Sequence, residues 1–342
     1  MLFYLQIFVI TILLSAGLTF LVIQLAKKLK IMDRPDKERK FHRGNIPLLG
    51  GLGIFFAFFI VLFIFRGYLL VGDLRPSHWL GFFIGASFLM IGGFLDDKYN
   101  LKPSRQFIFP VLAIASVIAG GVEMEKITNP LGGYFYLGSL SAVLISFWLL
   151  GMMYTTKLLD GLDGLVSGTT AIGSLTIFLF TLTPKYYQPD ISLAALALAA
   201  ASIGFLFFNW HPARVFLGEG GSLFLGYALG VLAVISGGKI AIALLVMGIP
   251  ILDVAWTILR RLIAGQNPFK SADRRHLHFR LLETGLSEKI SVLLFYTISI
   301  MFGLSALFLQ SIGKVFALIA LAGLMLLIVI FFAYLDRNKK KV

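Results

Sequence analysis

The sequence contains no cysteine, which excludes disulfide bonds, thiolate metal sites and cysteine nucleophiles. Charge is also scarce, because Asp, Glu, Lys and Arg make up 14% of the 342 residues while hydrophobic residues make up 58%. A soluble domain has too little interior to bury that much apolar surface. We therefore expect an all-α polytopic membrane protein, with the lipid bilayer as its solvent.

The sequence also lacks the marks of a removable leader and of separate domains. The first apolar run, 2–26, has no basic region before it and no clear small-residue cleavage site. We expect it to be a retained transmembrane helix and not a signal peptide. There is no internal repeat, low-complexity linker or detachable soluble segment, so residues 1–342 are expected to form a single integral membrane domain.

Long apolar runs dominate what is present. We expect about eleven transmembrane helices, several of them shorter than the ~20 residues of an average span. They are placed at residues 2–26, 48–65, 78–95, 106–121, 138–156, 169–183, 191–208, 220–236, 240–259, 290–309 and 315–335.

The lysines and arginines orient these spans. With the N-terminus outside and the C-terminus in the cytoplasm, all but six of the 30 basic residues fall on the cytoplasmic side, as the positive-inside rule requires. The formal net charge of +13 therefore does not call for a nucleic acid partner. The chemically richest segments are five cytoplasmic loops, at about 27–47, 96–106, 157–168, 209–222 and 260–289.

Two of these loops contain paired carboxylates. Asp96 and Asp97 are adjacent, and adjacent carboxylates stay ionised only where cations share the site. Asp160 and Asp163 are three residues apart, each followed by glycine, and on a helix that spacing would put both on one face. Carboxylate oxygens are hard ligands that suit Mg²⁺. The alternative for each pair is an ordinary solvated helix end or helix cap.

A glycine-rich segment precedes the span at 220–236. Gly218-Glu219-Gly220-Gly221-Ser222 would present free backbone N–H groups at a helix N-terminus, which is a favourable site for a phosphate. Glu219 could hold a metal ion bound to the same phosphate. A glycine-rich turn alone is weak evidence, and its position at a cytoplasmic membrane edge strengthens it.

Cationic side chains gather in the first and last of the five loops. Arg274, His276 and His278 would suit a diphosphate or nucleotide, and the alternative is a loop that binds anionic lipid headgroups. His42 and Arg43 lie in a basic segment that would suit the phosphate of a lipid, although topology alone predicts much of that charge.

Asp253 lies inside the span at 240–259, where a carboxylate costs about 2.5–3.5 kcal/mol to insert. We expect it to face the interior of the bundle and to have a partner. Metal-binding carboxylates, phosphate-binding glycines and cations at one membrane face together indicate phosphoryl transfer between a nucleotide-like donor and a lipid acceptor.

Several of these motifs occur in the order found in a known family. The sequence resembles the polyprenyl-phosphate N-acetylhexosamine-1-phosphate transferases, over essentially the whole chain. The segment 265–287, the eleven spans, Pro250 and Asp253 are most similar to the branch of undecaprenyl-phosphate GlcNAc-1-phosphate transferases. The matching motifs are Phe94–Asp97, Asp160–Leu165, Phe208–Trp210 with Pro212–Gly218, and the loop with His276 and His278.

The resemblance implies a Mg²⁺-dependent enzyme of the bacterial cytoplasmic membrane, with Mn²⁺ as the alternative ion. It would transfer a sugar 1-phosphate, GlcNAc-1-phosphate or a related one, from a UDP-sugar to undecaprenyl phosphate, release UMP and start cell-envelope glycan synthesis. The catalytic candidates are Asp96, Asp97, Asp160 and Asp163, and the metal ligands Glu219 and Asp97. With the residue patterns above, the substrate-binding candidates are Lys157, Asn209, Gly220, Ser222, Arg274, His276, His278, His42 and Arg43.

The sequence departs from the family pattern at several positions. Tyr154 and Lys157 stand where asparagines are usual, Glu219 replaces an aspartate, and Phe279 replaces the last histidine of its motif. Lys157 would contact the donor phosphates or compete with Mg²⁺ for Asp160. The alternative function is a catalytically silent relative that binds polyprenyl phosphate or a nucleotide sugar. A transporter is a third interpretation, disfavoured because most polar residues lie at the membrane edge. The sugar and a homodimeric state are left open.

Overall fold

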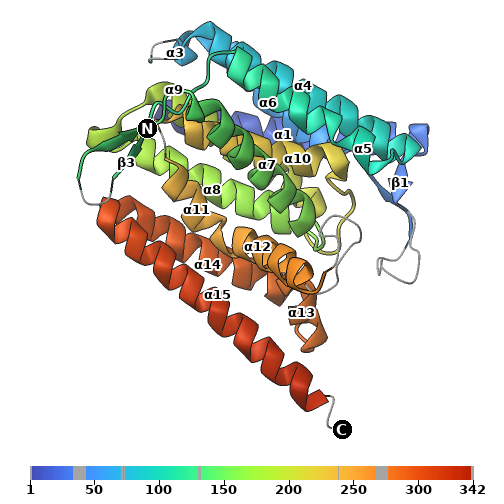
Figure 1. The fold of residues 1–342 in the computed structure, drawn as a ribbon. Coiled ribbons are helices and arrows are strands. Elements are labelled where there is room, and N and C mark those ends of the chain that lie inside the picture. Colours follow the sequence, from blue (N-terminus) through green and yellow to red (C-terminus); the bar gives the residue numbers. More distant parts are fainter. Residues whose placement is uncertain are drawn as a thin grey trace.

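The computed structural model describes residues 2–33, 44–70, 72, 74–129, 132–237, 239–265 and 276–339, without the side chains of the last two (Figure 1). Two short antiparallel hairpins accompany the helices, with Met32 opposite Pro47 in one and Lys126 opposite Tyr136 in the other. The elements are α1 (Leu2–Leu29), β1 (Met32–Asp33), β2 (Ile46–Pro47), α2 (Gly51–Ile64), α3 (Arg66–Leu69), α4 (Pro76–Tyr99), α5 (Pro103–Gln106), α6 (Ile108–Ala119), β3 (Lys126–Thr128), β4 (Tyr134–Tyr136), α7 (Leu140–Leu159), α8 (Leu165–Thr181), the 3₁₀ helix η1 (Pro184–Tyr186), α9 (Pro189–Asn209), α10 (Gly218–Ile235), α11 (Ile240–Val246), α12 (Gly248–Ile263), α13 (Leu277–Glu283), α14 (Glu288–Phe308) and α15 (Ser311–Lys339).

The helices have the length and apolar character of membrane spans. Within the described ranges, seven are long and apolar enough to cross a bilayer, and α11 with α12 makes an eighth if the bent pair is one span. Three shorter apolar segments, α2, α5–α6 and α8, cover the remaining expected spans. The expectation of a multi-pass, all-α membrane protein is confirmed, while the number eleven stays a prediction.

The centre of the bundle is formed by α9 and α10. Every residue of α9 from Asp190 to Ala201 is buried, and its many alanines let α1, α2 and α8 pack closely around it. Ser15 of α1 donates a hydrogen bond of 2.6 Å to the Ala201 carbonyl. By contrast, α15 runs along the edge of the bundle, as Figure 1 shows. Only 17% of its apolar window is buried inside the protein. Such a surface suits contact with lipid.

Glycines bring α10 close to its neighbours where it begins. A Cβ on Gly93 of α4 would lie 2.0 Å from the Gly220 nitrogen, and one on Gly51 of α2 would lie 2.1 Å from the Gly221 Cα. Small residues at helix contacts are typical of membrane bundles. Here they fix the distance between the carboxylates of α4 and the first turn of α10.

The span expected at 240–259 is broken. α11 and α12 meet at an angle of 79° around Met247. Pro250 lacks a backbone N–H, and its ring would clash with the Val246 carbonyl in a continuous helix, so the chain bends just before it. This bend places α12 and its Asp253 beside α13.

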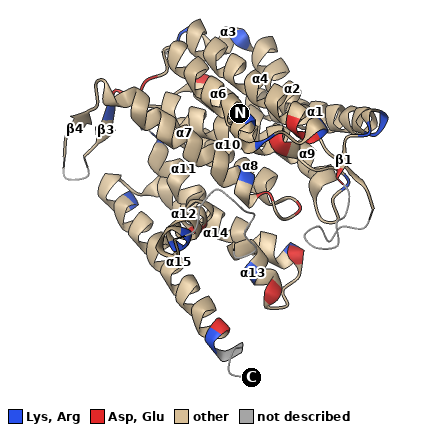
Figure 2. Ribbon diagram, turned by 45° about the vertical axis from the view of Figure 1, so that its right-hand side comes forward, with Lys and Arg blue, Asp and Glu red and all other residues tan. Residues whose placement is uncertain are grey.

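One end of the bundle collects the segments of interest. The last turns of α4, α7, α9 and α12 and the first turns of α8, α10 and α14 lie there, and we call this end the site end. Figure 2 shows acidic residues concentrated around it, while the middle of the helices is almost free of charge. The site end corresponds to the expected cytoplasmic face, and the orientation of the termini stays a prediction.

Candidate functional site

Backbone hydrogen bonds join the first and fourth of the predicted loops. Phe216 donates to the Pro47 carbonyl, and Gly50 donates to the Phe216 carbonyl, both at 2.9 Å. Gly51 donates to Leu217 at the same distance. The segment before α2 and the segment before α10 are therefore held together by backbone hydrogen bonds, and together they form one side of the site.

Asp96 and Asp97 lie in the last turn of α4 and point to different partners. Oδ1 of Asp96 accepts hydrogen bonds from the Leu101 N–H at 2.7 Å and from the Gln106 amide at 2.9 Å, so it closes the turn into α5. Asp97 instead accepts from the Glu219 N–H, at 3.1 Å to Oδ1 and 3.3 Å to Oδ2. Of the two, Asp97 is the one that faces α10.

Only glycine at position 218 permits this approach. Gly218 has a φ of +73°, and a Cβ on it would lie 2.4 Å from Oδ2 of Asp97. The glycine directly before Glu219 thus gives Asp97 access to the N-terminus of α10. There the helix dipole favours a negative group.

Lys157 lies in the last turn of α7 and forms an ion pair with Glu219. Its Nζ contacts Oε1 of Glu219 and donates a second hydrogen bond of 3.2 Å to Oε1 of Gln106. The Lys157 ammonium also lies 5.6 Å from the centre of the Tyr154 ring. Two of the four family-atypical positions, Lys157 and Glu219, are therefore in direct contact with one another.

Asp160 and Asp163 do not share a helix face, so that expectation was wrong. Residues 160–164 form turns between α7 and α8, because α7 ends at Leu159 and Gly164 adopts a φ of +80° before α8 begins. Part of Asp160 is accessible to solvent, although many protein atoms lie around its carboxyl group. Loss of hydration raises its pKa to about 8, and the negative charges of Glu219, Asp97 and Asp163 add to that shift.

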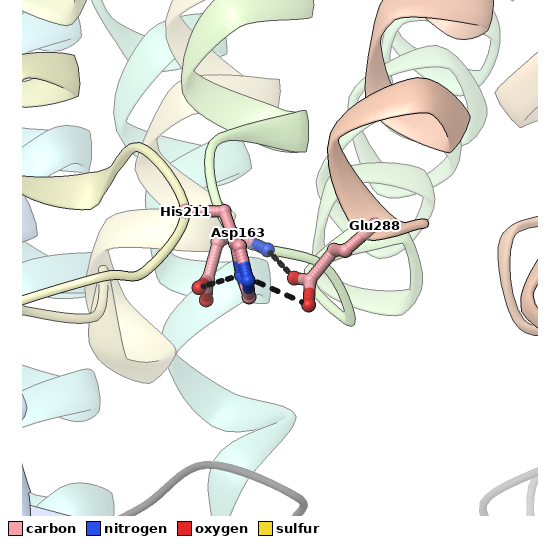
Figure 3. A group of neighbouring side chains, drawn as sticks. All are labelled: Asp163, His211 and Glu288. Carbon is pink, nitrogen blue, oxygen red and sulfur yellow. Dashed lines mark hydrogen bonds and ion pairs between the residues drawn. The ribbon is translucent and has the colours of Figure 1, made fainter. Parts of the chain in front are cut away.

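Asp163 belongs to a cluster with His211 and Glu288, drawn in Figure 3. Oδ2 of Asp163 lies 2.8 Å from Nδ1 of His211 and accepts from the Ala213 N–H at 2.9 Å. Glu288 accepts from the Asp163 N–H at 2.7 Å, and its other oxygen lies 3.1 Å from the same His211 nitrogen. The three ligand atoms lie within 4.8 Å of one another and could share a metal ion. A single proton on His211 also accounts for the contacts.

Asn209 joins the Asp163 turn to the segment before α10. Its buried Oδ1 accepts from the Gly164 N–H and from the Ser167 hydroxyl, both at 3.1 Å, and its amide donates to the Val215 carbonyl at 2.9 Å. The amide is thus engaged with protein on both sides. Its role toward substrate stays a prediction, and its structural role is to hold two loops in register.

Gly220 and Ser222 are buried in the first turn of α10. Gly220 packs against Gly93, and the Ser222 hydroxyl donates to the Glu219 carbonyl at 3.1 Å. The glycines of this segment therefore serve close helix contact, an explanation that the sequence-based phosphate hypothesis did not include. Contact of either residue with substrate stays a prediction.

His276 precedes α13 and is the partner of Asp253. Its Nδ1 lies 2.8 Å from Oδ2 of Asp253, and the Leu277 N–H donates to Oδ1 of the same carboxylate at 2.9 Å. Both side chains are buried. The expectation that Asp253 faces the interior and has a partner is confirmed, and the pair fixes the last loop to α12.

His278 lies close to the Asp160–Gly164 turn, against Gly161. A Cβ on Gly161 would come within 2.5 Å of Nε2 of His278, so glycine is required there. The imidazole is fully buried, and neither of its nitrogens has a hydrogen-bond partner among the described residues. Burial, with His276 stacked 5.7 Å away, lowers the pKa of His278 to about 3. It is therefore neutral and keeps one donor and one acceptor unused.

Three predicted substrate-binding residues, His42, Arg43 and Arg274, lie outside the described residues. Sequence reasoning in turn missed Gln106, His211, Glu288 and Tyr296. Tyr296 of α14 donates a 2.5 Å hydrogen bond to the Gly164 carbonyl. His211 offered the best signal, because it lies between the motif pieces Phe208–Trp210 and Pro212–Gly218. Glu288 looks like an ordinary acidic residue in the first turn of a helix.

The carboxylates around Lys157 fit a divalent cation. Asp97, Asp160 and Glu219 come from three elements and are close enough to act on the ionisation of Asp160. Among the described residues only Lys157 is paired with Glu219, so three carboxyl groups share one ammonium. Hard oxygen donors suit Mg²⁺ or Mn²⁺, and a bound ion would favour the ionised form of these carboxyls. This set of oxygen ligands gives no reason to expect a metal ion other than these two.

Comparison with known proteins places this arrangement in a family. The model of glycosyl transferase family 4 matches residues 79–237, which include Asp97, Asp160, Asp163 and Glu219. A probable undecaprenyl-phosphate N-acetylglucosaminyl 1-phosphate transferase of Bacillus subtilis is 33% identical over 89% of this chain and 84% of its own length.

Two further relatives are similar over most of their length. An undecaprenyl-phosphate alpha-N-acetylglucosaminyl 1-phosphate transferase of Thermotoga maritima is 30% identical over 86% of this chain and 87% of its own length. A decaprenyl-phosphate N-acetylglucosaminephosphotransferase of Mycolicibacterium smegmatis is 29% identical over 76% and 71%. The chain therefore belongs to the polyprenyl-phosphate N-acetylhexosamine-1-phosphate transferases of glycosyl transferase family 4.

Proposed function

We propose that this protein transfers an N-acetylhexosamine 1-phosphate, GlcNAc-1-phosphate in the first instance, from a UDP-sugar to a polyprenyl phosphate. An oxygen of the lipid phosphate attacks the sugar-bound phosphorus of the donor, the bond to the bridging oxygen breaks, and UMP leaves. The observation that carries the proposal is the convergence of Asp97, Asp160 and Glu219 at one end of an apolar bundle, with Lys157 among them.

The position of each residue in the site indicates its role in the reaction. Asp97 faces the N-terminus of α10 and is the candidate to hold a cation or to accept a proton from the lipid phosphate. The turn with Asp163 is anchored by His211 and Glu288, so it offers a fixed wall for the nucleotide. His278, neutral and without a partner in the described structure, would serve as a hydrogen-bond donor next to that turn.

A bound Mg²⁺ would be held by Asp97 and Glu219, with Asp160 beside them. When bound it would neutralise the diphosphate and stabilise the charge that develops as UMP departs. Mn²⁺ would serve the same donor set. The residues themselves contribute positioning, because phosphoryl transfer requires little covalent chemistry from the protein.

The proposal includes a location and an acceptor. We assign the site end to the cytoplasm, with the N-terminus outside and the C-terminus inside, because all but six of the 30 basic residues then fall on the cytoplasmic side of the predicted topology. A water-soluble UDP-sugar would enter from the cytoplasm, and undecaprenyl phosphate from the bilayer. The product would start synthesis of a cell-envelope glycan in a bacterial cytoplasmic membrane.

The direct test uses purified protein, Mg²⁺, undecaprenyl phosphate and a panel of UDP-sugars, with UMP release as the readout. We expect UMP from at least one UDP-HexNAc, and loss of most activity in Asp97→Asn and Glu219→Gln. Folded protein that releases no UMP with any donor would exclude the transferase. Full activity in both variants would exclude the site assignment.

The second candidate is a silent relative that binds polyprenyl phosphate or a nucleotide sugar without transfer. One observation favours it, namely that the Lys157 ammonium already pairs with the carboxylate expected to bind the cation. The same assay separates the two candidates, provided that binding of UDP is measured in parallel. Binding of UDP without UMP release from any UDP-sugar would support the silent relative.

A further inference from the structure

The Lys157–Glu219 pair lies at the centre of the candidate site. The two side chains are 23% and 17% exposed, which shields their attraction from solvent more than at an open surface. Gln106 holds the ammonium from a second side at 3.2 Å, and Gln106 is itself held by Asp96. The ammonium is therefore positioned by the protein and is not a freely moving surface charge.

Glu219 has two roles that conflict. Its carboxylate is the only group of α10 in this cluster that can ligate a cation, and its Oε1 is already in contact with Nζ of Lys157. A divalent ion at that oxygen would lie next to an ammonium, and like charges at such distances repel strongly. Cation binding at Glu219 and the Lys157 contact are thus alternatives.

A displaced Lys157 would need a new anionic partner. Asp96 is engaged with the Leu101 N–H and with Gln106, and Asp97 receives the Glu219 N–H. A lysine side chain is a flexible four-carbon stem with a compact charge, so the ammonium can move while its backbone stays in α7. A diphosphate bound to the same cation would lie beside it and would supply the missing negative charge.

We propose that Lys157 is a resident counter-ion of Glu219 that a divalent cation must displace, and that the freed ammonium then binds the diphosphate of the donor. Cation and donor binding would be coupled as a result, each strengthening the other by the same factor. The identity of the donor rests on the proposed function. The competition for Glu219 rests only on the geometry of the pair.

The test measures Mn²⁺ binding to purified protein in detergent by electron paramagnetic resonance of the free ion. Wild type is compared with Lys157→Asn, which removes the charge, and with Lys157→Arg, which retains it. Lys28→Asn removes an exposed lysine in the last turn of α1. It is the matched control for general changes in net charge. Thermal unfolding of each variant confirms that it is folded.

We expect Lys157→Asn to bind Mn²⁺ about tenfold more tightly than wild type in the absence of nucleotide, because the competing cation is gone. Lys157→Arg and Lys28→Asn should stay close to wild type, and Glu219→Gln should bind weakly with either residue at 157. An unchanged or weaker Mn²⁺ affinity in folded Lys157→Asn would overturn the proposal.

The coupling is tested by repeating the titrations with a fixed concentration of UDP, so that chelation of Mn²⁺ by free UDP is the same for all variants. UDP should strengthen Mn²⁺ binding to wild type about tenfold more than it strengthens binding to Lys157→Asn. If UDP strengthens Mn²⁺ binding equally in wild type and Lys157→Asn, the proposed contact between Lys157 and the diphosphate is overturned. These readouts do not need turnover, so absence of sugar-phosphate transfer would remove the proposed function while leaving the competition for Glu219 intact.

Discussion

Asp253 in α12 accepts hydrogen bonds from both His276 and the Leu277 N–H, and so it fastens α13 to the membrane bundle. Removing the carboxylate in Asp253→Ala would leave two buried donors without an acceptor. We expect a loss of about 1–3 kcal/mol in the free energy of unfolding. The measurement is equilibrium unfolding in mixed detergent micelles.

Asp336→Asn is the matched control for that variant. Asp336 pairs with Arg280 at 2.6 Å, but its side chain is 55% exposed, so the pair is expected to contribute only about 0–1 kcal/mol. Equal losses in the two variants would show that the buried Asp253 contacts are not special. That result would contradict the role assigned to Asp253 in holding the last loop.

The close contact between Gly93 and Gly220 gives a second prediction. In Gly93→Ala the new methyl group would meet the Gly220 backbone, push α10 from α4 and lengthen the Asp97–Glu219 hydrogen bond. Overpacking of this kind costs about 1–3 kcal/mol in stability, and most transfer activity should be lost with it. Gly151→Ala on α7 has open space around its Cβ and should behave as wild type. A fully active Gly93→Ala would show that this contact does not set the site geometry.

The Asp163 cluster predicts an effect on positioning. In His211→Asn or Glu288→Gln the Asp163 turn loses one of its supports, so the donor would bind less accurately. We expect kcat/KM for the UDP-sugar to fall on the order of 10–100-fold, with a smaller change in stability. Glu283→Gln, an exposed acid on α13, is the control and should leave kcat/KM unchanged. Unaltered kcat/KM in both cluster variants would contradict a positioning role.

The raised pKa of Asp160 predicts a dependence of stability on pH. Without a divalent cation the folded protein keeps this carboxyl protonated up to about pH 8, whereas the unfolded chain ionises it near the ordinary aspartate pKa of 3.8. Between those values the folded state binds more protons, so stability falls as pH rises and levels off above about 8. Asp160→Asn should flatten that fall when unfolding temperatures are measured with a chelator between pH 5 and 9. An identical slope in the variant would contradict the assignment.

Much of the architecture followed from the sequence because membrane spans are encoded locally. Runs such as 2–26 and 191–208 need no long-range information, and each expected span coincides with an apolar helix or a consecutive pair of helices. The bend before Pro250 was missed because the span was assigned by apolar length alone, although the proline was present to signal it.

The sequence predicted which residues belong to the candidate site better than it predicted how they contact one another. Topology placed Asp97, Asp160 and Glu219 on one face, and the structure brings them together. The contact between Lys157 and Glu219 could not be foreseen, because residues 62 positions apart meet only through the packing of α7 on α10. The turn after α7 likewise separates Asp160 from Asp163, where spacing on an ideal helix would have aligned them.

The central claim is that the carboxylates at the site end carry out transfer of a sugar 1-phosphate to a polyprenyl phosphate. A UDP-HexNAc that carries ³²P in its sugar-bound β-phosphate tests this most directly, after incubation of the purified protein with undecaprenyl phosphate and Mg²⁺. We expect the label to move into the lipid phase while UMP appears in the aqueous phase, and Asp97→Asn to prevent both. Label that remains in aqueous UDP while the sugar enters the lipid, or no transfer by folded protein with any UDP-HexNAc, would contradict it.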